Sequence, residues 1–112
     1  MIEAKFHKAD DGSIRMVLKG HARTAPQGED LICAAATTLA YTAAQAVNFF
    51  HQQGKLKRAP KIDIREGSAT VIATPTQEGY PQVLHAFWVV QCGIHLLACN
   101  YPEQIRLEHL TL

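Results

Sequence analysis

The chain has 112 residues, of which 47% are apolar and 19% are charged, so it is long enough for one compact domain and too short for two. Its 11 Lys and Arg residues nearly balance its 10 Asp and Glu residues, which leaves a net charge of +1. Such a chain has no broad field that would attract nucleic acid, a membrane surface or acidic substrates, so binding by charge alone is not expected.

The cysteines and the N-terminal residues predict a cytoplasmic protein. The three cysteines are an odd number without a C-x-x-C pair, which favours free thiols in a reducing compartment. The first residues carry charges where a signal peptide needs an apolar stretch. No segment approaches the roughly 20 apolar residues of a membrane span, so we expect no membrane-spanning helix.

The first elements predicted are a β-hairpin and a long helix. Apolar and polar residues alternate over 2–6 and 14–19, the period of strands with one buried face, and Asp11-Gly12 between them favours a tight turn. Residues 31–53 contain neither Gly nor Pro and predict a helix that ends at Gly54. Its predicted buried stripe is Ile32, Ala35, Leu39, Ala43, Ala46 and Phe50.

A second hairpin, a second helix and a last strand follow. Residues 61–65 and 69–74 flank a Glu66-Gly67-Ser68 turn. Pro81 lies just inside a helix that runs to about Asn100. The last predicted strand contains Ile105, Leu107 and Leu110.

The second helix is apolar on two sides and therefore needs two partners. One side carries Val83, Phe87, Val90, Ile94, Leu97 and Tyr101, and the other carries Leu84, Trp88, Cys92, Leu96 and Cys99. A sheet can cover one side, while the other must meet the first helix or a second subunit. Trp88 accordingly packs either within the chain or in a dimer interface.

The element order is β-β-α-β-β-α-β, which predicts an α+β fold: a single layer of mainly antiparallel sheet with two helices packed on it. No linker, repeat or low-complexity segment interrupts the order, so residues 1–112 are expected to form one domain.

The stretch from Gly20 to Thr37 runs from a strand end through a loop into a helix and carries the candidate chemistry. Asp30 is a good N-cap, which places Cys33 in the first helical turn. There the helix dipole favours a thiolate by about 0.3–1 kcal/mol, too little by itself to ionise the thiol at neutral pH. His21 is the nearest group that could accept the thiol proton and return it to a leaving amine. Asp30 could be a cap or could orient the imidazole, and backbone N–H groups at the helix start could hold an oxyanion.

Cys33 is predicted at the rim of the helix rather than in its core. Along its line stand the small residues Thr37, Ala40 and Ala44, so an extended peptide or partner chain could approach closely.

A second group, Cys92, His95 and Cys99, suggests a metal site, but its geometry opposes one. The two cysteines are seven residues apart, about 10 Å along a helix axis, too far to share an ion bound at about 2.3 Å. We expect neither a metal nor another cofactor.

Three short pieces of the stretch resemble the signature of the ribosomal-processing cysteine protease family, Prp. They are Gly20-His21-Ala22, then Gly28, then the run from Asp30 to Ala36. The element order and the apolar second helix are similar to that family over essentially the whole chain. The resemblance implies that residues 1–112 form a single cysteine protease domain.

Carried over by position, the resemblance implies Cys33 as the nucleophile, His21 as the general base and acid, and Asp30 as a supporting residue. Thr37 stands where relatives carry Ser, one turn after the Cys, so a hydroxyl is kept while a methyl narrows the space beside the thiol. The family also has a mobile segment that closes over bound substrate, and here it corresponds to Ala22, Arg23, Thr24, Ala25, Pro26, Gln27, Gly28 and Glu29.

Members of the family are small homodimers that remove a short N-terminal extension from the large-subunit ribosomal protein numbered twenty-seven. The resemblance therefore implies a cysteine endopeptidase that acts on this extended protein and supports ribosome assembly. We expect no membrane as a partner, and no direct contact with nucleic acid is required. The alternative is a catalytically inactive homodimeric module that binds ribosomal protein or RNA and keeps His21 and Cys33 for packing. The basic run 55–61 could contact ribosomal RNA or only complement the C-terminal end of the first helix.

Overall fold

Over residues 1–22 and 30–110, which the computed structural model describes, the chain forms five strands and two helices. In chain order these are β1 (Ile2–Lys8), β2 (Ile14–Lys19), α1 (Leu31–Gln52), β3 (Lys61–Arg65), β4 (Ser68–Ala73), α2 (Tyr80–Asn100) and β5 (Ile105–Glu108). The predicted element order is confirmed, and the bounds differ from the expected ones by one or two residues.

The strands form one mixed sheet in the spatial order β3-β4-β2-β1-β5. Three neighbouring pairs are antiparallel, whereas β5 joins the edge of the sheet parallel to β1. Because α2 carries the chain from β4 back along the sheet, β5 runs in the same direction as β4 and hence as β1. The predicted α+β class with a mainly antiparallel sheet is therefore confirmed.

A network of side-chain contacts closes the turn between β1 and β2. The hydroxyl and the backbone N–H of Ser13 donate to Asp11 Oδ1 at 2.6 and 2.9 Å, and Arg15 lies 3.1 Å from the other carboxylate oxygen. These contacts, with the Ser13 hydroxyl contributing most, lower the pKa of Asp11 to about 2. Gly12 takes the left-handed φ of +86° that this turn requires.

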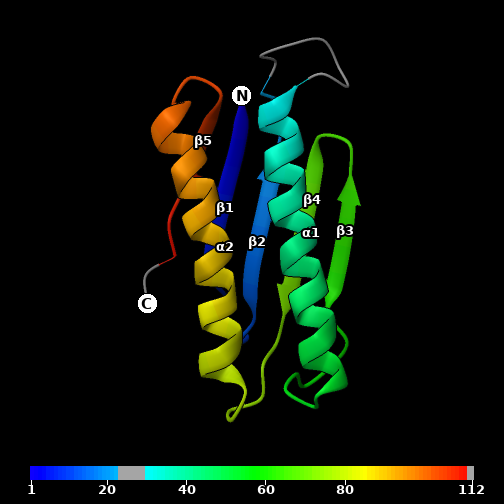
Figure 1. Cartoon of the computed structure of the whole chain (residues 1–112). Coiled ribbons are helices and arrows are strands. Elements are labelled where there is room, and N and C mark those ends of the chain that lie inside the picture. The colour runs from blue at the N-terminus through cyan, green and yellow to red at the C-terminus, as the bar shows by residue number, and fades with distance from the viewer. Residues whose placement is uncertain (23–29, 111–112) are drawn as a thin grey trace.

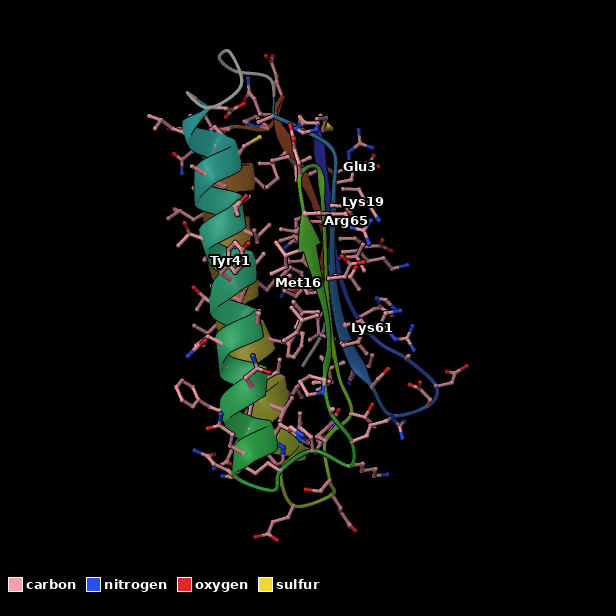
Figure 2. The ribbon with its side chains drawn as sticks, turned by 90° about the vertical axis from the view of Figure 1, so that its right-hand side faces the viewer. Glu3, Met16, Lys19, Tyr41, Lys61 and Arg65 are labelled. Atoms are coloured by element: carbon pink, nitrogen blue, oxygen red, sulfur yellow. The ribbon has the colours of Figure 1, made fainter. Side chains whose placement is uncertain are left out.

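Both helices cover the same face of the sheet, so the core lies between the helices and that face (Figure 1). Met16 points toward α1, whereas Glu3, Lys19, Lys61 and Arg65 point to the opposite side of the sheet (Figure 2). This inside–outside alternation follows from the two-residue period of a strand. The inward residues of the first two strands are buried, namely Ile2, Ala4, Phe6, Ile14, Met16 and Leu18.

The buried face of α1 differs from the predicted stripe. Of the predicted residues, Ile32 and Ala43 are buried, but Ala35, Leu39, Ala46 and Phe50 are only half-buried. The residues that face the core instead are Ala36, Ala40, Ala44 and Val47. Small alanines let the helix backbone approach the sheet closely, while the larger side chains sit at the margins.

The same rotation corrects a second expectation about α1. Ala40 and Ala44 were expected on an open line with Cys33, but both are buried in the core. Only Thr37 of the three small residues remains exposed. The row of residues that begins at Cys33 is therefore accessible for about one helical turn, as far as Thr37, because Ala40 and Ala44 pack on the sheet.

The two apolar sides of α2 have different surroundings. Val83, Phe87, Val90 and Ile94 of the first side are buried, as expected. On the second side Leu84 is buried, whereas the remaining residues are exposed, namely Trp88, Cys92, Leu96 and Cys99. α1 packs against one flank of α2, where a Cβ atom at Gly93 would lie 2.6 Å from the side chain of Leu39.

α2 also corrects the expectation that no segment resembles a membrane span. Its 21 residues include a window with a mean hydropathy of 1.4, which is long and apolar enough to cross a membrane by length and composition alone. In this fold the helix instead packs along the sheet, and Phe87 and Ile94 lie in the core.

The last strand is shorter than predicted, because β5 ends at Glu108 and Leu110 lies beyond it. Leu110 is nevertheless buried and held by Gln91 of α2. The Gln91 amide donates to the Leu110 carbonyl at 3.2 Å and accepts from the Leu110 N–H at 2.6 Å. A side-chain amide thus satisfies the backbone groups that a neighbouring strand would otherwise bind.

Candidate active site

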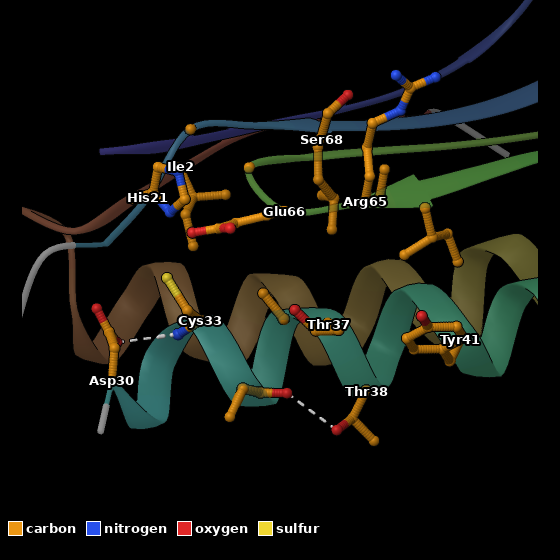
Figure 3. A pocket seen from close by; sticks show the side chains of 17 residues that line it. Ile2, His21, Asp30, Cys33, Thr37, Thr38, Tyr41, Arg65, Glu66 and Ser68 are labelled. Carbon is orange, nitrogen blue, oxygen red and sulfur yellow. Dashed lines mark hydrogen bonds between the residues drawn. The ribbon is translucent and has the colours of Figure 1, made fainter. Parts of the chain in front are cut away.

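A groove of about 1080 Å³ lies between the N-terminal half of α1 and the adjacent end of the sheet. Ile2, Leu18 and Ile64 from the strands supply apolar lining, and α1 supplies Cys33, Thr37 and Tyr41. The end of β2 adds His21, and the β3–β4 turn adds Glu66 and Gly67. In the close-up of Figure 3, His21, Glu66 and Cys33 lie near one another at one end of the groove.

Asp30 places Cys33 by capping α1. Its Oδ1 atom accepts from the backbone N–H groups of Ile32 and Cys33, both at 3.0 Å. The predicted N-cap is therefore confirmed, and Cys33 occupies the first turn of the helix. Cys33 therefore lies at the positive end of the helix dipole, because the first N–H groups of a helix face its N-terminal end.

Three of the N–H groups that could hold an oxyanion already have acceptors within the chain. Those of Ile32 and Cys33 already bind the Asp30 carboxylate, and the N–H of Ala34 donates to the Asp30 carbonyl at 3.0 Å. An oxyanion there would have to displace these bonds.

His21 follows β2 after one residue, Gly20, whose backbone is held by close contacts. Gly20 takes a φ of +100°, and its N–H donates to the carbonyl of Gly67 at 2.9 Å. A Cβ atom at Gly20 would lie 2.2 Å from the carbonyl oxygen of Met1, so only glycine fits. This turn directs the His21 side chain into the groove (Figure 3).

The two residues predicted to carry the chemistry line the same groove. The Cys33 sulfur points toward His21 in Figure 3. Among the described residues the sulfur accepts a hydrogen bond from the N–H of Ala22 at 3.2 Å, and none joins it to His21. Catalytic hydrogen bonds are often long before substrate binds, so this arrangement suits a thiol and a base that meet in the complex.

Ala22 is the first residue of the segment predicted to close over substrate. It is buried, and its N–H donates to Cys33 Sγ at 3.2 Å. The other predicted loop residues, 23–29, lie outside the described residues.

Glu66 and Gly67 were predicted only as a turn, and the structure adds them to the site. Glu66 extends from the turn toward His21 and Cys33 (Figure 3). The cause is the antiparallel pairing of β2 with β4, in which Lys19 lies opposite Ser68. No local sequence signal announces this, because a strand pattern does not name its partner.

The group of Cys92, His95 and Cys99 is arranged differently from what the sequence pattern suggests, because His95 contacts Cys99 and His109. Cys99 Sγ lies 3.4 Å from His95 Nε2, and His95 Nδ1 lies 3.1 Å from Nε2 of His109. The two contacts use opposite nitrogens of the His95 ring, which one metal ion cannot reach together. Within residues 1–22 and 30–110, no three His, Cys, Asp or Glu residues could hold a metal ion together.

Replacing Asp30 separates its capping role from its charge. Asp30→Ala is expected to lower the free energy of unfolding by about 0.5–2 kcal/mol, because two N–H groups lose their acceptor. Asp30→Asn keeps an acceptor oxygen and should stay close to wild type in stability and cleavage rate. Urea unfolding and peptide-cleavage assays measure both. A stable Asp30→Asn protein with a much lower kcat would show instead that the carboxylate charge acts on the imidazole.

Comparisons with known proteins assign the chain to a family. The family model described as cysteine protease Prp matches residues 1–106. The comparison with curated proteins found no match.

Similar structures cover the whole fold. The structure of Prp, an essential ribosomal processing protease from S. aureus, with a covalently linked product peptide has a TM-score of 0.69 and 20% identity, covering 99% of this chain and 100% of the other. The same protease with a substrate peptide has a TM-score of 0.65 and 18% identity over the same shares. A protein from Streptococcus mutans has a TM-score of 0.67 and 27% identity, covering 100% of this chain and 96% of the other. With the family model matching nearly the whole chain, this protein belongs to the cysteine protease Prp family.

Proposed function

We propose that this protein is a cytoplasmic cysteine endopeptidase that removes the short N-terminal extension of the large-subunit ribosomal protein numbered twenty-seven. Membership of the Prp family supports a cysteine protease. The observation that carries the proposal is the groove in which Cys33, at the start of α1, points toward His21. The similar S. aureus structures with bound peptides support a peptide as the substrate class.

In the proposed reaction Cys33 is the nucleophile and His21 moves the proton. His21 takes the thiol proton, and the sulfur attacks the carbonyl carbon of the scissile peptide bond. The imidazolium then gives its proton to the leaving amine as the carbon–nitrogen bond breaks. Water hydrolyses the thioester that remains and regenerates the thiol.

The groove suits an extended, flexible N-terminal peptide. Its apolar residues Ile2, Leu18 and Ile64 offer contact for apolar side chains of a substrate, and Tyr41 is exposed farther along α1. Thr37 presents its side chain one turn after Cys33 (Figure 3). A chain without secondary structure can enter such a groove, whereas a folded domain cannot bring its backbone to the sulfur.

The exposed side of α2 supports a homodimer. Trp88, Val89 and Leu96 leave 38%, 64% and 63% of their surface exposed, although large apolar residues are normally buried. They lie on the helix that the sequence predicts to need two partners. We propose this side of α2 as the dimer contact, since neither the sheet nor α1 covers it.

The function is tested by incubating the protein with the N-terminally extended ribosomal protein and reading the product mass. We expect a product shortened by the extension, and none from Cys33→Ala. Cys92→Ala is the matched control, because it removes another free thiol that lies outside the groove, on the side of α2 proposed for the dimer contact. An intact substrate with all three proteins, together with binding to it, would favour the inactive module instead.

A further inference from the structure

The turn between β3 and β4 lies directly against the imidazole of His21. Gly67 in this turn has a φ of +72°. A Cβ atom built on it would lie 2.7 Å from His21 Nε2, 3.2 Å from Cε1 and 3.5 Å from Cδ2. The ring therefore packs on the backbone of residue 67 at a distance that only glycine permits.

The same turn also holds the backbone next to His21. The carbonyl of Gly67 accepts from the N–H of Gly20 at 2.9 Å. The β2–β4 pairing continues this contact, with Lys19 opposite Ser68 and Leu18 opposite Ala69. Gly67 thus leaves room for the imidazole beside its Cα atom, and its carbonyl binds the backbone of Gly20, the residue before His21.

We propose that Gly67 is a positioning residue, which sets where the His21 imidazole stands relative to Cys33. This inference rests on the proposed function, in which His21 moves the proton. A side chain at residue 67 would occupy the space of the ring, and the ring is the movable partner because it ends a side chain. The fold would then survive, whereas the imidazole would leave its place. Misplacing a catalytic group by about 1 Å can cost about 10²-fold in rate.

The chain offers a matched control at Gly54. Gly54 has a φ of +73°, almost the same as Gly67, but a Cβ atom there would have nothing within 4 Å. The substitutions Gly67→Ala and Gly54→Ala thus place Ala at nearly the same unfavourable φ, and only the first adds a contact with His21. The difference between the two variants measures that contact.

Three measurements compare the two variants. We expect Gly67→Ala to lower kcat for peptide cleavage at least about tenfold with KM within about twofold, and to slow alkylation of Cys33 by iodoacetamide relative to wild type. Gly54→Ala should match wild type in both rates. Both variants should lose a similar amount of Tm. Cleavage and alkylation rates of Gly67→Ala within twofold of those of Gly54→Ala would overturn the proposal.

A structural readout keeps this inference separate from the proposed function. In NMR spectra, the His21 ring resonances should move in Gly67→Ala and stay in place in Gly54→Ala. Unmoved resonances would overturn the positioning role even in an active enzyme. A wild-type protein that cleaves nothing would refute the proposed function, while the ring shift would still report the contact.

A second pair of variants covers the case in which Gly67→Ala does not fold. Asn tolerates a positive φ better than Ala, so Gly67→Asn and Gly54→Asn reduce the strain and keep the added side chain. The same loss of kcat and the same shift of the His21 resonances are expected for Gly67→Asn alone. Equal behaviour of the two Asn variants would overturn the proposal.

Discussion

Replacing His21 with alanine is expected to lower kcat for cleavage of the extended ribosomal protein by about 10²- to 10⁴-fold, the usual contribution of a positioned general base. The thiol of Cys33 would then lose the group that takes its proton, although the helix dipole would remain. Single-turnover cleavage, followed by product mass, measures the chemical step. Alkylation of Cys33 by iodoacetamide should slow in parallel, since it also requires the thiolate.

His51→Ala is the control for this substitution. His51 is exposed in the last turn of α1, at the opposite end of the helix from Cys33, and lines no part of the groove. Its replacement should leave both rates unchanged. Equal rates for His21→Ala and wild type would mean that another group activates the thiol, and the proposed role of His21 would be wrong.

Replacing Phe87 with alanine is expected to lower the free energy of unfolding by about 3–5 kcal/mol. Phe87 is only 1% exposed and lies on the side of α2 that packs on the sheet. Its loss removes apolar burial and leaves a cavity that a close-packed core cannot fill completely. Since small domains have only about 5–15 kcal/mol in total, urea unfolding should detect a large fall in the midpoint.

Phe49→Ala is the matched control for the core substitution. Phe49 has the same side chain and also lies in a helix, but half of its surface is exposed, at 50%. Its replacement should change the free energy of unfolding by much less than that of Phe87. Similar losses for the two variants would show that the core does not lie where α2 meets the sheet.

The local features of the site could be predicted because each depends on neighbouring residues. Asp30 is a capping residue, and its bonds to the N–H groups of Ile32 and Cys33 follow from a spacing of two and three residues. The end of β2 before Gly20 was likewise visible from residue order. The short motifs around His21 and Cys33 carried the family resemblance, and the family model confirms it.

The rotation of α1 could not be predicted with the same success. Its sequence contains alanine at many positions, so several stripes have similar apolar character. The sheet selects the stripe of Ala36, Ala40 and Ala44, because small side chains allow the closest approach. Packing against a surface that lies elsewhere in the chain therefore overrode the apparent periodicity.

Residue patterns alone were enough to predict the order of the elements, their approximate ends, the helix start that carries Cys33 and the family to which the chain belongs. These depend on hydrophobic period, capping and turn residues, which act over a few neighbouring positions. Three other features became visible only in the folded chain: the β3–β4 turn brings Gly67 next to His21, β5 lies beside β1, and one side of α2 is exposed. Such contacts join residues far apart in the chain, and the choice of partner depends on the packing of the whole fold.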